Sequence, residues 1–527
     1  MPPVKRPRLA RLDNHLRKHG VAVYGIVHGR TRRRLRQQYP EALPVGNSRQ
    51  RCRLNSDFCM VLSDRTAAAT ITALRSDAAM TDQPASSTIS QPTSAVDPYA
   101  AWRSRDYRLL AASWFLLVFS REVERVAVLV YVYAATGTPL ALGWVGLVQA
   151  VPVILLSIAG GQLADRYDRC KVLAATLALS TLTTAGLLLV SLRPELLRTA
   201  QTDYTLVSIY ALLGLGAVGQ ALGSPARAAL LPLLVPPHCL SNAVAWNSTV
   251  FRVASMLGPA MGGLLLGVQR NTAAALAVAC VSRAVAVLAV LAISGRPQQR
   301  QSEGVTWASV LAGLQFVLKT QTMLAAITLD LFAVLLGGAT YLMPIFANDI
   351  LGVGDWGVGA LLSCEALGAV CMTLIIAHLP PIRRAGKALL WSVTAFGVAT
   401  IVFGLSRNFW LSATMMFLIG AFDNISVIVR HTLVQMLTPD HMRGRVSAVH
   451  NVFIVASNDL GGLESGVTAR LFGPVVSVVG GGIGTILVVL AVARRWPQLL
   501  RVGRLQDIRP ADDARLPGPM ELGQQTL

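Results

Sequence analysis

Twelve blocks of about 20 mostly apolar residues follow one another between residues 109 and 493, separated by short polar connections. A helix needs about 20 apolar residues to cross the hydrocarbon core of a bilayer. The chain is also 53% hydrophobic and only 14% charged, unlike an ordinary soluble domain. We therefore predict an all-α membrane protein with twelve transmembrane helices. The spans are expected at 109–134, 140–163, 172–192, 204–223, 243–268, 272–294, 322–346, 356–379, 386–405, 408–429, 446–469 and 472–493.

The connections between the blocks carry unequal numbers of Arg and Lys. With the N-terminus inside, the cytoplasmic side holds twenty of these residues, Arg227 and Arg430 among them, and the outer side holds five. Loops rich in Arg and Lys stay in the cytoplasm. Because the number of blocks is even, we expect both termini on the cytoplasmic side of the inner or cytoplasmic membrane.

The blocks divide into two six-helix halves, predicted at 101–295 and 321–495. A polar cytoplasmic connection at 296–320 joins them, and a cytoplasmic tail follows at 496–527. Lys171-Val172-Leu173 in the first half has a counterpart in Lys387-Ala388-Leu389 in the second. Parallel halves with the substrate path between them are a known plan of transporters.

Residues 1–100 are predicted to be a disordered extension. The first 80 residues hold 16 Lys and Arg against 5 Asp and Glu, and residues 81–98 are rich in Ser, Thr, Pro and Gln. The scarcity of Lys in the whole chain is typical of GC-rich coding DNA, so we interpret residues 1–79 as sequence upstream of a true start at Met80. A targeting peptide, or an arm that binds nucleic acid or anionic lipid, is the alternative.

The connection between the second and third blocks, GGQLADRYDRCKVL (160–173), concentrates charge. Its Gly161, Asp165, Arg166, Arg169 and Lys171 stand at the spacing of the loop signature of the major facilitator superfamily, which the chain resembles from about residue 102 to residue 495. The resemblance implies the major facilitator fold, and a loop that helps to hold the two halves in one state on the cytoplasmic side. The alternative is that these charges only fix the topology.

Two positions of this loop depart from the family pattern. Asp168 stands where the family usually has glycine, and Cys170 stands where it usually has a basic residue. A carboxylate at a helix terminus is suited to bond exposed N–H groups and to face the positive end of the helix dipole.

The stretch SMLGPAMGGLLL (255–266) resembles the antiporter motif of the same superfamily. Gly258, Pro259, Gly262 and Gly263 match that motif, whereas Ala254 and Ala245 replace its earlier glycines. Gly-Pro kinks a membrane helix, and small residues four apart let a neighbouring helix approach closely. Ordinary helix packing is the alternative interpretation.

Other stretches, among them ASNDLGGLESG (456–466), resemble the branch of the superfamily that contains enterobactin-type siderophore exporters and macrolide efflux proteins. This resemblance implies an exporter without naming its cargo.

Charges inside the apolar blocks are informative, since inserting one charged side chain at the middle of a membrane helix costs about 2.5 to 3.5 kcal/mol of free energy. In SREVERVA (120–127), helical geometry places Arg121, Glu122, Glu124 and Arg125 within an arc of about 160°. They form either a self-paired structural cluster or a functional one in which Glu122 or Glu124 accepts a proton.

Further charged residues fall inside other predicted spans. The candidates for a proton or substrate cavity are Asp330, Glu365 and Asp423. Arg252, Arg283, Asp459 and Glu464 share this placement. As a set they predict a polar central cavity, although structural pairing is the expectation for any single member.

Motifs that would indicate a nucleotide, metal or catalytic site either are absent or lie in the wrong structural context. GLGAVG (214–219) fits a dinucleotide-binding pattern, but it lies inside the fourth block and follows no strand. The sequence contains no G-x-x-x-x-G-K-[ST], no C-x-x-C and no H-E-x-x-H. We therefore expect no enzyme, no metal site and no bound cofactor, and the proton gradient as the energy source.

Together these patterns predict a secondary exporter of a small molecule that works by proton antiport and alternating access. Its expected partners are the lipid bilayer and its substrate, without nucleic acid, and the protein is expected to be a monomer. A proton-coupled importer of the same fold is one alternative. A membrane-anchored regulator with a basic nucleic-acid-binding arm is the other.

Overall fold

The computed structural model divides the chain into two units, Met1–Val96 and Asp97–Leu527. The described residues are 52–54, 58–60, 97–197, 204–269, 271–294, 307–337, 339–380, 382–439 and 442–503. In the first unit, β1 (Cys52–Leu54) and β2 (Phe58–Met60) form an antiparallel pair. The rest of the predicted N-terminal extension, including Met80, lies outside the described residues, as does most of the predicted tail.

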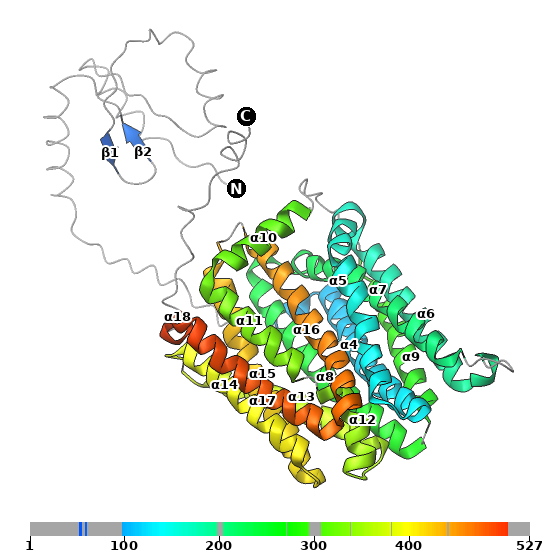
Figure 1. The fold of residues 1–527 in the computed structure, drawn as a ribbon. Helices are drawn as coiled ribbons and strands as arrows, with labels where there is room; N and C mark the ends of the chain where they lie inside the picture. Colours follow the sequence, from blue (N-terminus) through cyan, green and yellow to red (C-terminus); the bar gives the residue numbers. More distant parts are fainter. Residues whose placement is uncertain are drawn as a thin grey trace, which may run out of the picture. The chain divides into compact units, whose positions relative to one another are not determined.

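The first half of the second unit consists of long helices in sequence order (Figure 1). They are α4 (Arg105–Thr136), α5 (Pro139–Arg166), α6 (Arg169–Leu192), α7 (Thr205–Leu234), α8 (Leu240–Gln269) and α9 (Thr272–Leu291). Three short 3₁₀ turns accompany them, η1 (Ala100–Arg103), η2 (Pro194–Leu197) and η3 (Pro237–Cys239).

The second half begins with α10 (Trp307–Lys319), which lies in the predicted connection, and α11 (Gln321–Leu336). The short elements η4 (Ala339–Leu342), α12 (Met343–Ile345) and η5 (Phe346–Ile350), a π-helical turn, follow. The remaining helices are α13 (Asp355–His378), α14 (Ala385–Leu405), α15 (Phe409–Leu437), α16 (Arg443–Phe472), α17 (Pro474–Arg495) and α18 (Pro497–Arg501).

The predicted all-α membrane fold with two halves is confirmed. Ten helical segments of the described residues are long and apolar enough to cross a bilayer. The two remaining predicted spans fall on α4 and α16, which have 32 and 30 residues and carry several charges each. The seventh predicted span differs from a single helix. Gly337 ends α11, and Pro344, which has no N–H to donate, lies in the short α12 that follows.

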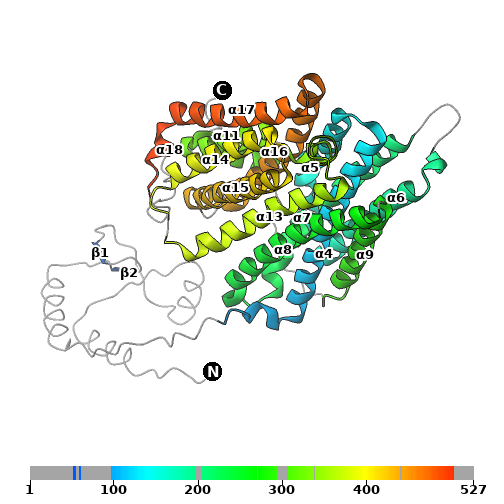
Figure 2. The same cartoon turned by 90° about the horizontal axis from the view of Figure 1, so that it is seen from below.

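Two seams join the halves, one between α5 and α16 and the other between α8 and α13 (Figures 1 and 2). Both depend on glycine. In the first seam, a Cβ on Gly466 would lie 2.8 Å from the Cα of Gly143. In the second, a Cβ on Gly359 would lie 2.3 Å from the carbonyl oxygen of Pro259 and 2.5 Å from the Cα of Gly263. Only residues without side chains let these backbones approach so closely.

The halves share their largest hydrophobic core cluster toward one end of the bundle. The largest apolar cluster combines residues of α4 and α5 with Leu342, Phe346 and Val358 of the second half. It lies toward the end that holds the α4–α5 connection, which is predicted to be the outer side. Around Leu110 and Leu173 at the other end, the buried cluster draws on the first half alone, and around Ala385 it draws on the second half alone.

Substituting Gly359 by Ala is expected to weaken the α8–α13 seam. Its methyl group would overlap backbone atoms that have no rotamer to adopt, and overpacking of this kind costs about 1 to 3 kcal/mol. Thermal unfolding of the purified protein in detergent measures the effect. Gly480→Ala is the control, because a Cβ there meets nothing within 4 Å. Equal midpoints for the two variants would contradict the role of the seam.

Candidate functional site

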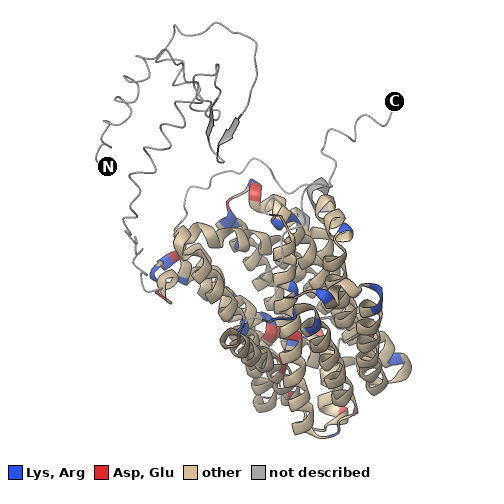
Figure 3. Cartoon of the chain, turned by 90° about the vertical axis from the view of Figure 1, so that its left-hand side faces the viewer, with Lys and Arg blue, Asp and Glu red and all other residues tan. Residues whose placement is uncertain are grey.

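The charges of α4 lie where the two halves meet, and Figure 3 shows acidic and basic residues together inside the bundle. Arg121 donates from Nη2 to Glu122 Oε1 at 3.1 Å. Arg125 Nη1 lies 3.6 Å from Glu122 Oε2. The Glu122 residue is only 7% exposed, so two arginines compensate one buried carboxylate.

Glu124 takes a different partner because it stands at the opposite edge of the helical arc from Glu122. Its Oε2 lies 2.9 Å from Nη1 of Arg283 in α9 and accepts from the hydroxyl of Thr184 in α6 at 2.5 Å. Arg283 also donates to Ser120 Oγ at 3.1 Å, to the carbonyl oxygen of Ser180 at 3.0 Å and to the Thr184 hydroxyl. The charges of α4 are therefore not paired only with each other. This network ties three helices of one half together.

Arg125 reaches the second half of the protein. Its guanidinium carbon lies 5.4 Å from the centre of the Tyr341 ring in η4. The Tyr341 hydroxyl donates to Asp459 Oδ1 of α16 at 2.9 Å. A Cβ on Gly462 would lie 2.6 Å from the Tyr341 ring. Sequence reasoning flagged Asp459 but missed Tyr341. The available signal was its position in an apolar block interrupted by glycine and proline, which often marks a transporter site.

Asp330 and Arg430 form a second buried ion pair, between α11 and α15. The two residues are 7% and 2% exposed. The assignment of Arg430 to a cytoplasmic loop was therefore wrong, and so was that of Arg227, which lies inside α7. Helix α15 continues past its apolar block because Arg430 pairs with Asp330 inside the protein, and Arg227 on α7 stacks on the Trp114 ring. The orientation of the termini stays a prediction.

Glu365 of α13 and Asp423 of α15 are half-buried. No hydrogen bond or ion pair to either carboxylate forms within the described part of the chain. The charge of Arg125 acts on Glu365, and the charge of Arg252 acts on Asp423. Two carboxylates of the second half therefore interact with arginines of α4 and α8, which belong to the first half.

The antiporter-like motif packs α8 against both α4 and α13. A Cβ on Gly258 would lie 2.6 Å from the Cβ of Glu122. A Cβ on Gly262 would lie 3.1 Å from the Cβ of Val126, and Gly263 faces Gly359 as described above. The motif thus positions helix α8 directly beside the buried carboxylate Glu122.

In the charged loop between α5 and α6, the aspartate that replaces the family glycine caps a helix. Asp168 Oδ1 accepts from the backbone N–H groups of Cys170 at 2.8 Å and Lys171 at 3.1 Å. Arg169 donates to the carbonyl oxygens of Ala164 and, on α7, Ala229, at 3.4 and 3.2 Å. The replacement therefore supplies an N-cap at the start of α6.

The other candidate residues of the loop make fewer contacts. Arg166 lies over the Tyr167 ring, with 5.8 Å between the guanidinium carbon and the ring centre. Asp165 makes no ion pair or hydrogen bond through its side chain to any residue that the structure describes. Lys171 is exposed.

A cavity of about 160 Å³ lies inside the first half, between α4, α5, α6, α7 and α9. Its charged lining residues are Arg121, Glu124, Arg227 and Arg283. The guanidinium carbon of Arg227 lies 3.4 Å from the centre of the Trp114 ring. This cavity differs from the expected central one because one half supplies all of its lining. Gly216 and Gly219 of the GLGAVG stretch face Thr183 and Ser180 of α6, so this stretch packs helices.

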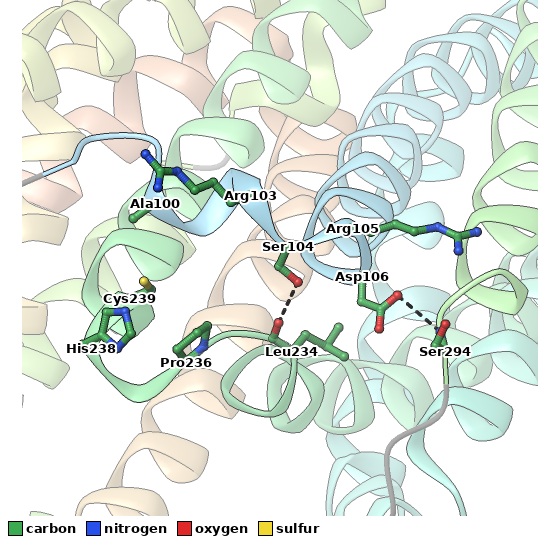
Figure 4. Close-up of a pocket in the computed structure, with 10 residues that line it drawn as sticks. All are labelled: Ala100, Arg103, Ser104, Arg105, Asp106, Leu234, Pro236, His238, Cys239 and Ser294. Carbon is green, nitrogen blue, oxygen red and sulfur yellow. Dashed lines mark hydrogen bonds between the residues drawn. The ribbon is translucent and has the colours of Figure 1, made fainter.

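A pocket of about 570 Å³ lies at the ends of α4, α7 and α9 (Figure 4). Ser104 Oγ donates to the carbonyl oxygen of Leu234 at 2.9 Å, and the N–H of Ser294 donates to Asp106 at 3.3 Å. Arg103 and Arg105 extend in opposite directions. These contacts fasten helix ends and do not converge on a ligand. No group of three His, Cys, Asp or Glu residues suited to a metal occurs within the described ranges.

Two halves of long helices with charged residues at their junction are the arrangement of a membrane transporter. Solved transporters share this fold. A nucleoside transporter, NupG, aligns with 74% of this chain and 99% of its own, at a TM-score of 0.58 and 12% identity. A D-xylose–proton symporter aligns with 73% of this chain and 96% of its own, at a TM-score of 0.58 and 14% identity.

Residues 97–519 match the family described as Transmembrane secretion effector, so the chain belongs to this family of major facilitator superfamily transporters. The enterobactin exporter EntS of Shigella boydii serotype 18 is 27% identical over 402 residues, which are 74% of this chain and 93% of that protein. EntS of Escherichia coli O157:H7 has the same identity and coverage. The resemblance to this branch is confirmed, and the protein is a multi-pass membrane transporter.

Replacing Glu124 by Gln is expected to destabilise the first half by about 3 kcal/mol or more, because it leaves the buried Arg283 without its counter-charge. Glu195→Gln is the matched control, since the Arg193–Glu195 pair is exposed and worth at most about 1 kcal/mol. Thermal unfolding in detergent measures both. The double variant Glu124→Gln/Arg283→Gln should recover part of the loss. A Glu124→Gln midpoint equal to that of the control would refute the pairing.

Proposed function

We propose that the protein is a secondary exporter that expels a small organic molecule from the cell in exchange for protons. The observation that carries this proposal is the chain of contacts from Glu122 through Arg125 to Tyr341 and Asp459. It links a buried carboxylate, which can hold a proton, to a contact between the two halves. The export direction is supported by the similarity to enterobactin exporters.

Protonation of Glu122 changes the balance of electrostatic attraction between Arg125 and its neighbours on the two halves. When the carboxylate is charged, it shares Arg121 and Arg125 and draws Arg125 back onto α4. When a proton neutralises it, the charge of Arg125 acts more strongly on Tyr341 and Asp459. Opposite charges attract strongly where the surroundings have a low dielectric constant. A protonated Glu122 thus favours closed halves at the end where they share a core.

This coupling moves protons inward and cargo outward, as an exporter driven by protons requires. A proton taken up from the outside closes the outer end and opens the path to the cytoplasm, where the proton leaves and the cargo binds. Loss of the proton then weakens the contact between Arg125 and the second half, which favours opening to the outside. Only the difference in binding between the two states drives such a shift. The energy comes from the proton gradient, without a bound cofactor.

For the cargo, we propose a siderophore, a macrolide or another drug-like compound. Import of the same compounds by the same fold is the competing direction. A strain that lacks the gene separates the two, because loss of an exporter raises intracellular cargo whereas loss of an importer lowers it. Wild-type behaviour of this strain, in both macrolide challenge and siderophore secretion, would remove the two favoured cargo classes.

In that strain, wild-type protein is expected to restore erythromycin resistance or siderophore secretion, and Glu122→Gln is not, because a neutral amide cannot exchange the proton. A protonophore should abolish the wild-type effect. Glu195→Gln is the control, with the same chemical change on an exposed residue. Immunoblots of membranes establish equal insertion. If Glu122→Gln restores export fully, the coupling assigned to Glu122 is wrong.

Asp165→Asn is expected to leave the protein inserted and to reduce transport. Its carboxylate has no described partner in this state of the molecule, so it remains available to bond a helix end of the second half in the other state. Asp168→Asn is the control three residues away. Asn preserves the N-cap, so transport should persist. The complementation assay compares them, and equal activity would leave the loop charges with a topological role alone.

A further inference from the structure

The cavity inside the first half contains an arginine that no carboxylate compensates. Arg283 on its wall is saturated by Glu124, Ser120 and neighbouring oxygens. Arg121 shares Glu122, which lies outside the cavity lining. Arg227 stacks on Trp114 and, within the described residues, has no acidic partner and donates no hydrogen bond.

This arrangement leaves strong hydrogen-bond donors without acceptors. A guanidinium carries five N–H donors and no acceptor, and those of Arg227 have no acceptor among the described residues. The indole Nε1 of Trp114 is buried without a hydrogen-bond partner. Buried donors such as the Trp114 N–H are nearly always satisfied in proteins. Arg227 is half-buried, and a charge held partly away from water is costly unless it is paired. The unmet donors therefore point to an anion as the missing partner.

The size and walls of the cavity restrict what that anion is. An engineered protein cavity of about 150 Å³ holds one benzene molecule, and this one measures about 160 Å³. Leu117, Leu177 and Leu213 supply apolar surface opposite the charged groups. The cavity is not sealed, because Gln220 and Ser224 on its α7 wall are exposed. A single ring with one acidic substituent fits both its volume and its mixed lining.

We propose that this cavity is a binding subsite for an aromatic carboxylate of the benzoate class, either free or as the end group of a larger cargo. The carboxylate accepts from the Arg227 guanidinium, a pairing that is strong because planar forks of donors and acceptors match. The ring lies among the three leucines beside Trp114. The subsite depends on the proposed function only in identifying its ligand as cargo.

Calorimetry on the purified full-length protein in detergent tests the subsite with benzoate, benzamide, hexanoate and phosphate. Benzoate is expected to bind at least about tenfold more tightly than each of the others, because only benzoate combines the charge with the ring. Equal binding by benzamide would overturn the role of charge. Equal binding by hexanoate or phosphate would overturn the role of the ring.

Variants locate the site. Arg227→Gln is expected to lose at least about tenfold in benzoate affinity, whereas Arg470→Gln, which removes an exposed arginine at the end of α16, keeps it. Ser224→Phe provides a second test that leaves the ion pairs intact, since a bulky side chain at this exposed position blocks the opening. Unchanged benzoate binding in a folded Arg227→Gln protein would overturn the proposal, and unchanged binding in Ser224→Phe would do the same.

These binding results are independent of the export assay. The protein could bind benzoate through Arg227 and still fail to complement the deletion strain. That result would contradict the exporter proposal and leave the subsite in place. Export without such binding would remove the subsite and leave the exporter proposal intact.

Discussion

A charge inside a lipid bilayer must find a partner within the protein, and this requirement organises the whole bundle. Glu124 with Arg283 and Asp330 with Arg430 are buried ion pairs that each join helices of one half. Removing one member of such a pair leaves a buried charge whose cost is several kcal/mol. Each half is therefore stabilised by ion pairs whose disruption costs several kcal/mol. We infer that each half moves as a unit.

The contacts between the halves are of another kind. The seams at Gly143 with Gly466 and at Gly263 with Gly359 hold backbones together by close packing, without a buried ion pair at these glycines. The polar contacts across the junction include the ring contact of Arg125 with Tyr341 and the hydrogen bond that the Tyr133 hydroxyl donates to Asp349. Strong ties within halves and weaker ones between them are what a rocking transporter requires.

Much of the fold could be predicted from the sequence because the bilayer imposes it locally. Apolar blocks of fixed length indicated every long helix, and the loop after α5 indicated the family. The prediction was wrong for Arg227 and Arg430, because a hydropathy pattern treats a charge as the end of a span. Whether a charge is buried depends on a partner that lies far away in sequence, such as Asp330 for Arg430.

The candidate site was predictable only in part for the same reason. The pattern in SREVERVA indicated a charged face on α4, but it did not reveal that Glu124 turns to α9 while Arg125 turns to Tyr341. The stacking of Arg227 on Trp114 joins residues more than a hundred positions apart, without a motif. By contrast, the Asp168 cap is local, and its hydrogen bonds extend only three residues along the chain.

Distances between spin labels test the division into two rigid halves most directly. In a cysteine-free background, one label pair at Tyr167 and Gly444 spans the halves, and another at Tyr167 and His238 lies within the first half; all three positions are exposed. When pH is changed to protonate or deprotonate the junction carboxylates, the account predicts that the distance distribution between Tyr167 and Gly444 shifts while that between Tyr167 and His238 stays the same. A shift within the first half, or none between the halves, would contradict it.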